Sequence, residues 1–315
     1  MVTVVICTYN RCDSLRETLR SLARQRLSSG LTLEVIVVDN NSQDKTRAVV
    51  EEMAKTLPWS VQYLFEARQG LSVARNTGLR AARGQVLAFI DDDVVVEPQW
   101  AQALWNCFAE TRCDGVAGCV KPRWICPRPS WLSDELYGPI VRQELGTQRL
   151  RWTARDRFML GANMAFRKDV FEAIGLFKEE LGRRGNALIG GEDLDLHERL
   201  MAAGKVIFYE PSAVAHHTVT PERASPEFYR CWFEDIGYTQ AHQLKWKGRY
   251  QLSVIPLWRW GALVRAGTRY LGTRLSGATH DARFRAELWW LFQRSFLIER
   301  LDHWRGKSPC RFARA

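Results

Sequence analysis

The sequence Val-Leu-Ala-Phe-Ile-Asp-Asp-Asp-Val-Val-Val, residues 86–96, decides how the rest of the chain is interpreted. Its first five residues are apolar and follow Gly84, a pattern typical of a strand that is buried on both faces. The strand then runs into three carboxylates, Asp91, Asp92 and Asp93. Open α/β sheets bind ligands at the carboxyl ends of their strands, and adjacent carboxylates repel one another unless a cation joins them. The stretch therefore predicts a Mg²⁺ or Mn²⁺ site, with an acidic solvated turn as the alternative.

Further strands and helices alternate along the first part of the chain. Apolar runs predict strands at residues 2–7, 33–38, 61–65 and 115–120. Amphipathic segments between these runs predict helices, so we expect an α/β fold with a Rossmann-like, mostly parallel sheet flanked by helices. No Gly-x-Gly-x-x-Gly follows the first strand, and the sequence has no Walker lysine motif. These absences argue against a dinucleotide dehydrogenase and a P-loop enzyme.

Polar side chains follow the first two strands, as the three aspartates follow the central one. Thr8 and Asn10 come after the first strand, and Asp39 comes after the second. Because the carboxyl ends of parallel strands lie along one edge of the sheet, these side chains should share a crevice with Asp91–Asp93. For Asp39 a turn-forming role is the alternative, since Asn and Ser residues follow it directly.

A later acidic stretch, residues 190–200, offers a candidate general base. Asp195 and Glu198 have the spacing of a capping box, which gives Asp195 a structural explanation and leaves Asp193 in the loop before the helix. Neighbouring acids would raise the pKa of Asp193 toward that of a working base. We therefore prefer Asp193 to Asp195 as the base.

Composition sets the broad class of the protein. The 315 residues suffice for one large domain or for a domain with an appendage. The chain begins almost directly with a strand, so we expect no signal peptide, and no apolar run is long enough to span a bilayer. Eight cysteines without a Cys-x-x-Cys pair indicate reduced thiols in a cytoplasmic protein.

The positive charge is concentrated near the C-terminus. Residues 221–315 contain 17 Lys and Arg but 8 Asp and Glu, and they account for nine of the ten net positive charges. Seven of the 13 tryptophans also lie there. This asymmetry predicts two functional regions, an acid-bearing domain at residues 1–220 and a basic, tryptophan-rich helical region at 221–315.

Several ordered motifs together resemble those of family 2 glycosyltransferases, the large inverting group with the GT-A fold. The motifs are Thr8-Tyr9-Asn10-Arg11, Val38-Asp39-Asn40-Asn41-Ser42, Gly70-Leu71-Ser72-Val73-Ala74-Arg75-Asn76-Thr77-Gly78, Phe89-Ile90-Asp91-Asp92-Asp93, Gly191-Glu192-Asp193-Leu194-Asp195-Leu196 and His216-His217. The resemblance covers residues 1–220 and implies a GT-A catalytic domain with a helical C-terminal extension. Within that domain it implies a nucleotide-sugar-binding half at 1–120 and an acceptor-binding half at 121–220.

The resemblance also implies roles for individual residues. The residues expected to bind the donor are Thr8, Tyr9, Asn10, Arg11, Asp39, Gly70, Arg75, Asn76, Asp91 and Asp92. A divalent metal, Mn²⁺ or Mg²⁺, would be held by Asp93, with His216 or His217 completing the site, and the sequence does not choose between the two histidines. Asp193 would be the general base. The residues expected on the acceptor side are Gly161, Asn163, Glu192 and Asp195.

These roles lead to a specific expected reaction. We expect a metal-dependent inverting transfer of sugar from a nucleotide-diphosphate sugar, a UDP-sugar, to a hydroxyl of a glycan or lipid-linked acceptor. One base and one metal suffice for this reaction, whereas a glycosidase needs two flanking carboxyl groups. A sugar nucleotidyltransferase is one alternative, but it would need a Gly-rich N-terminal loop with a basic residue, which the segment Thr8–Arg11 is not. A non-catalytic glycan- or lipid-binding module is the other, and the joint presence of Asp91, Asp93 and Asp193 argues against it.

The C-terminal region contains three predicted helices, at residues 226–247, 257–271 and 284–301. In the second helix, Leu257, Trp260, Val264 and Leu271 form one stripe, and arginines lie elsewhere on the helix. Such a pattern suits an anionic membrane surface, so we expect a cytoplasmic protein that is peripheral on the inner face of the membrane. Packing on the catalytic domain or on a second subunit, as a homo-oligomer, is the alternative. No recognition motif supports nucleic-acid binding.

Overall fold

The computed structural model describes residues 1–153, 159–185, 188, 190–243, 255 and 257–305. Lys247, the expected end of the first C-terminal helix, lies outside the described residues. The chain forms two compact units. One, called here the sheet unit, contains residues 1–125, 140–181 and 192–219. The other, called the helical unit, contains residues 126–139, 182–191 and 220–315, so it includes two segments that precede residue 220.

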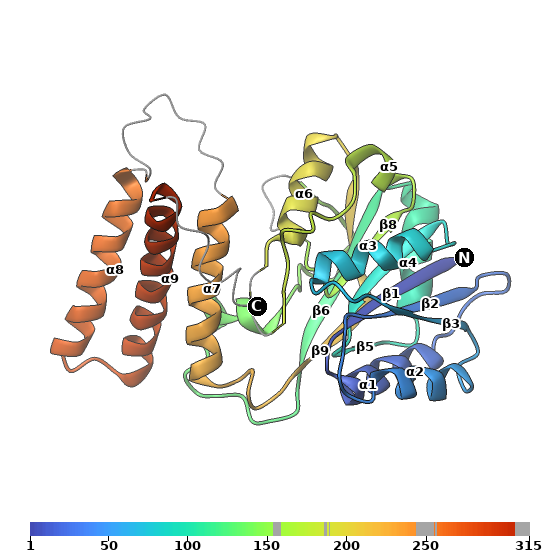
Figure 1. Cartoon of the computed structure of the whole chain (residues 1–315), viewed down its shortest axis with the longest axis horizontal. Helices are drawn as coiled ribbons and strands as arrows, with labels where there is room; N and C mark the ends of the chain where they lie inside the picture. The colour runs from blue at the N-terminus through green and yellow to red at the C-terminus, as the bar shows by residue number, and fades with distance from the viewer. Residues whose placement is uncertain (154–158, 186–187, 189, 244–254, 256, 306–315) are drawn as a thin grey trace. The chain divides into compact units, whose positions relative to one another are not determined.

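The sheet unit is built on one mixed sheet (Figure 1). Its parallel half has the order β3-β2-β1-β4, and its other half continues as β8-β6-β9-β5, with β7 also paired to β9. In this half β8 runs antiparallel to β4 and β6, whereas β6 and β9 are parallel. The strands are β1 (Val2–Thr8), β2 (Leu33–Asp39), β3 (Ser60–Phe65), β4 (Val86–Asp91), β5 (Val94–Val96), β6 (Gly115–Trp124), β7 (Leu150–Arg151), β8 (Asn163–Arg167) and β9 (Ile207–Val219).

Helices cover both faces of this sheet and bury two hydrophobic clusters. One cluster contains side chains of α1 (Cys12–Ala23), α2 (Thr46–Ala54) and α4 (Trp100–Thr111). The other contains side chains of α3 (Leu71–Ala81), α5 (Val170–Ile174) and α6 (Glu192–Ala202). Strands β1, β2 and β4 are almost fully buried, as their apolar runs predicted, whereas β3 at the edge of the sheet is only partly buried. The sheet flanked by helices on both faces confirms the predicted α/β class.

The register of the parallel half aligns the strand ends that carry polar side chains. Thr8 of β1 is paired with Asp39 of β2, and Cys7 of β1 is paired with Asp91 of β4. The polar residues after three strands therefore lie along one edge of the sheet, as the strand order predicted.

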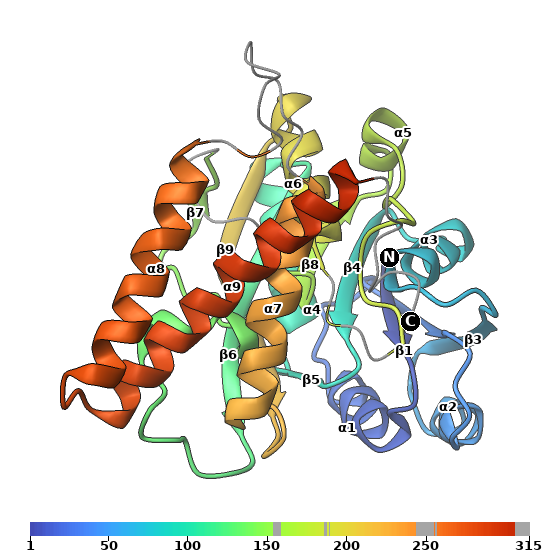
Figure 2. The ribbon, with the colours of Figure 1, turned by 60° about the vertical axis from the view of Figure 1, so that its left-hand side comes forward.

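The helical unit contains α7 (Pro226–Gln243), α8 (Leu257–Leu275) and α9 (His280–Trp304), with the short helix η1 (Asp134–Leu136); a second short helix, η2 (Gly138–Ile140), ends in the sheet unit. Helix α9 packs between α7 and α8 (Figures 1 and 2). Trp131 joins the helices, because its ring packs edge-on against Tyr229 of α7 and Phe284 of α9, at 4.9 and 5.0 Å between centroids. No helix in the described part of the chain is both long and apolar enough to cross a membrane.

Candidate active site

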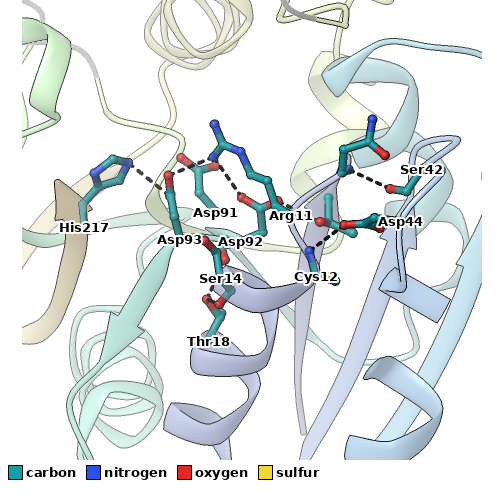
Figure 3. Close-up of polar contacts among 12 residues, drawn as sticks. Arg11, Cys12, Ser14, Thr18, Ser42, Asp44, Asp91, Asp92, Asp93 and His217 are labelled. Atoms are coloured by element: carbon teal, nitrogen blue, oxygen red, sulfur yellow. Dashed lines mark hydrogen bonds and ion pairs between the residues drawn. The ribbon is translucent and has the colours of Figure 1, made fainter. Parts of the chain in front are cut away.

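Asp92 and Asp93, directly after β4, are held at the sheet edge by contacts from β1 and from the start of α1 (Figure 3). The Thr8 hydroxyl donates a hydrogen bond to Asp92 Oδ2 at 2.8 Å. One guanidinium nitrogen of Arg11, at the start of α1, lies 2.9 Å from Asp93 Oδ2 and 3.3 Å from Asp92 Oδ1. Burial raises the pKa of Asp92 to about 6, and the Arg11 charge opposes that shift. Arg11 therefore balances part of the negative charge that these aspartates gather.

Asp91, Asp93 and His217 form a cluster suited to a metal ion. One ligand atom from each lies within 4.8 Å of the other two, and within the described residues this is the one such group of three. His217 Nε2 is 3.2 Å from Asp93 Oδ1, and the imidazole is almost fully buried. His216 instead points to Glu97, with 3.1 Å between His216 Nε2 and Glu97 Oε1.

The choice between the two histidines follows from strand geometry. Both lie on β9, which pairs with β5 in a register that places Val94 opposite His217 and Val95 opposite His216. Successive side chains of a strand point to opposite faces, so only one histidine can face the aspartates. The geometry therefore joins His217, and not His216, to the acidic cluster.

The donor chemistry of this cluster fits a divalent transition metal. Carboxylate oxygens bind Mg²⁺, Mn²⁺ and Ca²⁺ alike, but an imidazole nitrogen favours transition metals. Two carboxylates with one histidine thus fit Mn²⁺ better than Mg²⁺. Asp91, which the family resemblance placed at the donor, belongs to this cluster as well.

A second acidic group lies at the start of α6, around a buried arginine of α3. Arg75 Nη1 is 2.8 Å from Glu192 Oε1, and Arg75 Nη2 is 3.7 Å from Asp91 Oδ1. Asp193 accepts hydrogen bonds from the backbone N–H of Leu194 at 2.9 Å and of Gly161 at 3.3 Å. Arg75 therefore connects the metal cluster, through Asp91, to the pair of acids that contains the expected base.

The pKa of Asp193 is raised to about 7, first by burial and then by the neighbouring Glu192 carboxylate, while Arg75 opposes the shift. A carboxyl group with such a pKa accepts a proton far more readily than an ordinary aspartate does. Gly161 makes the arrangement sterically feasible, because a Cβ at this position would overlap the Arg75 guanidinium.

The predicted capping box at Asp195 and Glu198 is wrong. Helix α6 begins at Glu192, so Asp195 lies within the helix and Asp193 lies in its first turn, not in the preceding loop. Asp195 forms ion pairs with Lys178 and with Arg199, the latter at 2.8 Å. These ion pairs, and not a capping box, therefore give Asp195 its structural role.

The loops after β1 and β2 are bound to one another at the carboxyl ends of these strands. Asp39 is buried and accepts hydrogen bonds from the backbone N–H of Ser42 and from the Tyr63 hydroxyl, both at 2.8 Å. Asn10 adopts a left-handed φ of 53°, and its N–H donates to Ser42 Oγ at 2.9 Å. Tyr9 is half-buried in the same loop.

Two asparagines that sequence reasoning placed at the substrate are buried and bonded within the protein. The Asn76 amide donates to the carbonyl of Phe177 at 2.9 Å and accepts from its N–H at 3.0 Å. Asn163 is fully buried in β8, where it donates to the carbonyls of Cys119 and Ala213 and accepts from Trp100 Nε1. We assign both a structural role.

Sequence reasoning missed two residues that shape the site. Asn40 accepts from the N–H of Gly70 at 2.8 Å and donates to the carbonyl of Arg68, so it fixes the loop before α3. The ring of Phe177 lies 5.4 Å from the Arg75 guanidinium carbon and covers one face of it. Asn40 directly follows a strand end, which could have drawn attention to it. Phe177 carries no such signal.

The fold belongs to the GT-A glycosyltransferase class, and comparison with known proteins identifies the family. The model of "Glycosyl transferase family 2" matches residues 3–175. The succinoglycan biosynthesis protein ExoM of Rhizobium meliloti is 32% identical over 226 residues, which are 71% of this chain and 69% of that protein. The glucosyl-dolichyl phosphate glucuronosyltransferase of Haloferax volcanii is 30% identical over 221 residues, 69% of this chain and 68% of that one. The chain belongs to glycosyltransferase family 2.

Solved structures share the fold at low sequence identity. The mannosyltransferase PcManGT of Pyrobaculum calidifontis, in complex with GDP-Man and Mn²⁺, matches with a TM-score of 0.59 and 18% identity, over 98% of this chain and 88% of that one. A TarS fragment of S. aureus in complex with UDP-GlcNAc matches with a TM-score of 0.54 and 18% identity, over 97% and 92% of the two chains. The chain spans 55% of a longer TarS chain. Family membership makes the protein a glycosyltransferase of glycan biosynthesis, and it argues against a nucleotidyltransferase and a non-catalytic module.

Proposed function

We propose that the protein is a metal-dependent, inverting glycosyltransferase that uses a UDP-sugar and transfers the sugar to a hydroxyl of a glycan or lipid-linked acceptor. The observation that carries the proposal is the position of Arg75. It lies 2.8 Å from Glu192, the neighbour of Asp193, and 3.7 Å from Asp91 of the metal cluster. A candidate base and a candidate metal site are thus connected by one side chain.

The donor would bind along the edge of the parallel half of the sheet, within residues 1–120. Asp39, Thr8, Tyr9, Asn10 and Arg11 lie there, at the ends of β1 and β2. The complex of TarS with UDP-GlcNAc supports a UDP-sugar, whereas the complex of PcManGT with GDP-Man shows that this fold also accepts a guanine nucleotide. Because these similarities concern the fold alone, a panel of donors is needed to decide whether the nucleotide carries uracil or guanine.

Asp91, Asp93 and His217 would hold the metal, and the loops after β1 and β2 would hold the nucleotide. When bound, a divalent ion supplies positive charge that stabilises the leaving nucleoside diphosphate. Mn²⁺ in the PcManGT complex supports this choice of ion. Arg11 already pairs with Asp93, so it is positioned to exchange between the protein carboxylate and a donor phosphate.

Asp193 would accept the proton of the acceptor hydroxyl as that oxygen attacks the anomeric carbon. Attack on the face opposite the leaving group inverts the configuration of that carbon. With a pKa of about 7, Asp193 is ionised often enough near neutral pH to accept a proton and basic enough to do so efficiently. Glu192, within residues 121–220 on the acceptor side, would tune Asp193 through its charge, and Arg75 would limit that effect.

Release of nucleoside diphosphate from a panel of sugar nucleotides, with Mn²⁺ or with EDTA, tests this function. We expect Asp93→Asn and His217→Gln to weaken Mn²⁺-dependent donor binding by at least about 10- to 100-fold, the loss that is typical even when only a partner of a metal ligand is removed. His216→Gln is the matched control and should bind donor normally. Asp193→Asn should bind donor with unchanged affinity but lose turnover. Equal effects of the two histidine changes, or turnover by Asp193→Asn at the wild-type rate, would contradict the assignment.

A further inference from the structure

Helix α8 exposes an apolar stripe to solvent. Trp260, Val264, Leu271 and Leu275 have exposed fractions of 41%, 60%, 58% and 88%. At about 100° per residue they fall on one side of the helix, within an arc of about 60°. Scattered exposed leucines are ordinary, but four large apolar side chains on one side of a helix, interrupted by Gly267 and Thr268, are typical of an interaction surface.

The stripe is not the side on which α8 packs within the protein. The ring of Tyr270 stacks on Trp290 of α9 with 6.4 Å between centroids. The Arg259 guanidinium lies 4.0 Å from the centre of the Phe296 ring, also on α9. These contacts place the inward side of α8 around Arg259 and Tyr270, and the stripe lies on another side. Figures 1 and 2 show α8 beside α9, and Arg259 also donates a hydrogen bond to Gln240 of α7 at 3.4 Å.

The charges on α8 indicate what covers the stripe. Residues 257–275 contain four arginines and no other charged side chain. Arg274 lies on one side of the stripe and Arg265 on the other, and both are exposed. If two copies paired α8 against α8, arginines would face one another, and α8 itself supplies no carboxylate to balance them, which is unfavourable. Arginines also prevent α8 from spanning a bilayer.

We infer that α8 docks on an anionic membrane surface. The apolar stripe enters the boundary between headgroups and acyl chains, and Arg265 and Arg274 bind lipid phosphates beside it. Tryptophan suits the same depth because its ring is apolar and its N–H is polar. The inference goes beyond sugar transfer, since it concerns where the enzyme works and requires no turnover.

Co-sedimentation of the full chain with vesicles tests the inference. The vesicles contain phosphatidylcholine alone or with roughly 30% phosphatidylglycerol, at about 0.15 M salt, where surface charges are screened beyond about 8 Å. We expect binding to the anionic vesicles only. Arg265→Glu/Arg274→Glu should weaken it more than about 25-fold, since each basic residue near an anionic surface contributes about fivefold. Leu271→Ser/Leu275→Ser should weaken it about tenfold or more.

The controls change similar side chains on the sheet unit. Phe65→Ser/Leu150→Ser removes two exposed apolar side chains, and Arg47→Glu reverses an exposed charge. Both should bind the vesicles as the unchanged chain does. Absence of wild-type binding, equal binding to neutral vesicles, or equal loss in the controls would overturn the inference. A dimer in light scattering that Leu271→Ser/Leu275→Ser dissolves would show that a second copy covers the stripe instead.

Discussion

Arg75 is the cation on which the geometry around the candidate base depends, and replacing it with methionine tests that dependence. The side chain of Arg75 is 4% exposed and that of Glu192 is 7% exposed, with 2.8 Å between Nη1 and Oε1. The second oxygen of Glu192 has no hydrogen-bond partner among the described residues. Arg75→Met therefore leaves a buried carboxylate without its cation. Removal of one partner of a buried pair lowers the free energy of unfolding by about 3–5 kcal/mol.

The double variant Arg75→Met/Glu192→Gln distinguishes the effect of the unpaired Glu192 charge on stability from the effect of altered packing. If the loss in Arg75→Met comes from the unpaired carboxylate, removing that charge should restore about 2 kcal/mol, within the range found for residues in contact. Arg47→Met is the matched control, because Arg47 and Glu51 are also 2.8 Å apart but exposed. Loss of that pair should lower the free energy of unfolding by about 0.5 kcal/mol or less.

Hydrogen exchange of the β1 and β4 amides is the appropriate measurement. Because the chain has two compact units, a melt of the whole protein is not a single transition, whereas these amides report on the sheet unit alone. Strictly additive losses for the two single changes would refute the reasoning. So would a loss in Arg75→Met as small as that in Arg47→Met.

Three further outcomes follow from the site. Because Asp193 must be ionised to accept a proton and its pKa is about 7, kcat/KM should fall about tenfold per unit as the pH drops below 7, and Glu192→Gln should move that limb to lower pH. Gly161→Ala should lower the free energy of unfolding by about 1–3 kcal/mol, because its Cβ overlaps the Arg75 guanidinium. Asn163→Ala should lower it by at least about 3 kcal/mol, since three buried groups lose their hydrogen-bond partner.

Two control substitutions show whether the losses in Gly161→Ala and Asn163→Ala depend on their positions. Gly272→Ala on α8 adds a Cβ into open space and should be neutral or stabilising by up to about 1 kcal/mol. Asn106→Ala on α4 removes an exposed amide that accepts one hydrogen bond from Gln102, and it should lower the free energy of unfolding by less than about 1 kcal/mol. A pH limb that Glu192→Gln leaves in place, or equal effects of the two Gly→Ala changes, would contradict the arguments above.

The residues that lie at the edge of the sheet could be predicted from the sequence because the ends of its strands can be identified there. An apolar run that stops at Asp39 or at Asp91 specifies a buried strand and its last residue, and parallel pairing then places both ends together. The choice of His217 over His216 could have been predicted by the same reasoning. Had β9 been extended through Val219, alternation would have placed His217 on the face of the buried Ala215 and His216 on the other.

Polar side chains that form hydrogen bonds to distant parts of the backbone could not be predicted in this way. Asn76 lies in a motif that resembles one of the family and Asn163 was expected on the acceptor side, yet each amide binds a carbonyl group far away in the sequence. No local pattern encodes such partners, because they depend on how the segments pack. The same limit applies to α8. Its stripe was readable from periodicity, but periodicity does not tell whether an apolar stripe faces the protein or the solvent.

The position of Arg75 explains why residues from three distant segments must be considered together. The charge of the buried Glu192 carboxylate adds to the effect of burial and raises the pKa of its neighbour Asp193. The Arg75 charge opposes this rise, and the pKa of Asp193 lies at about 7. A fixed guanidinium can fill this position only because residue 161 lacks a Cβ. Gly161, Arg75 and Glu192 thus act together on Asp193. Their combined effect is a general base that is ionised at the pH at which it works.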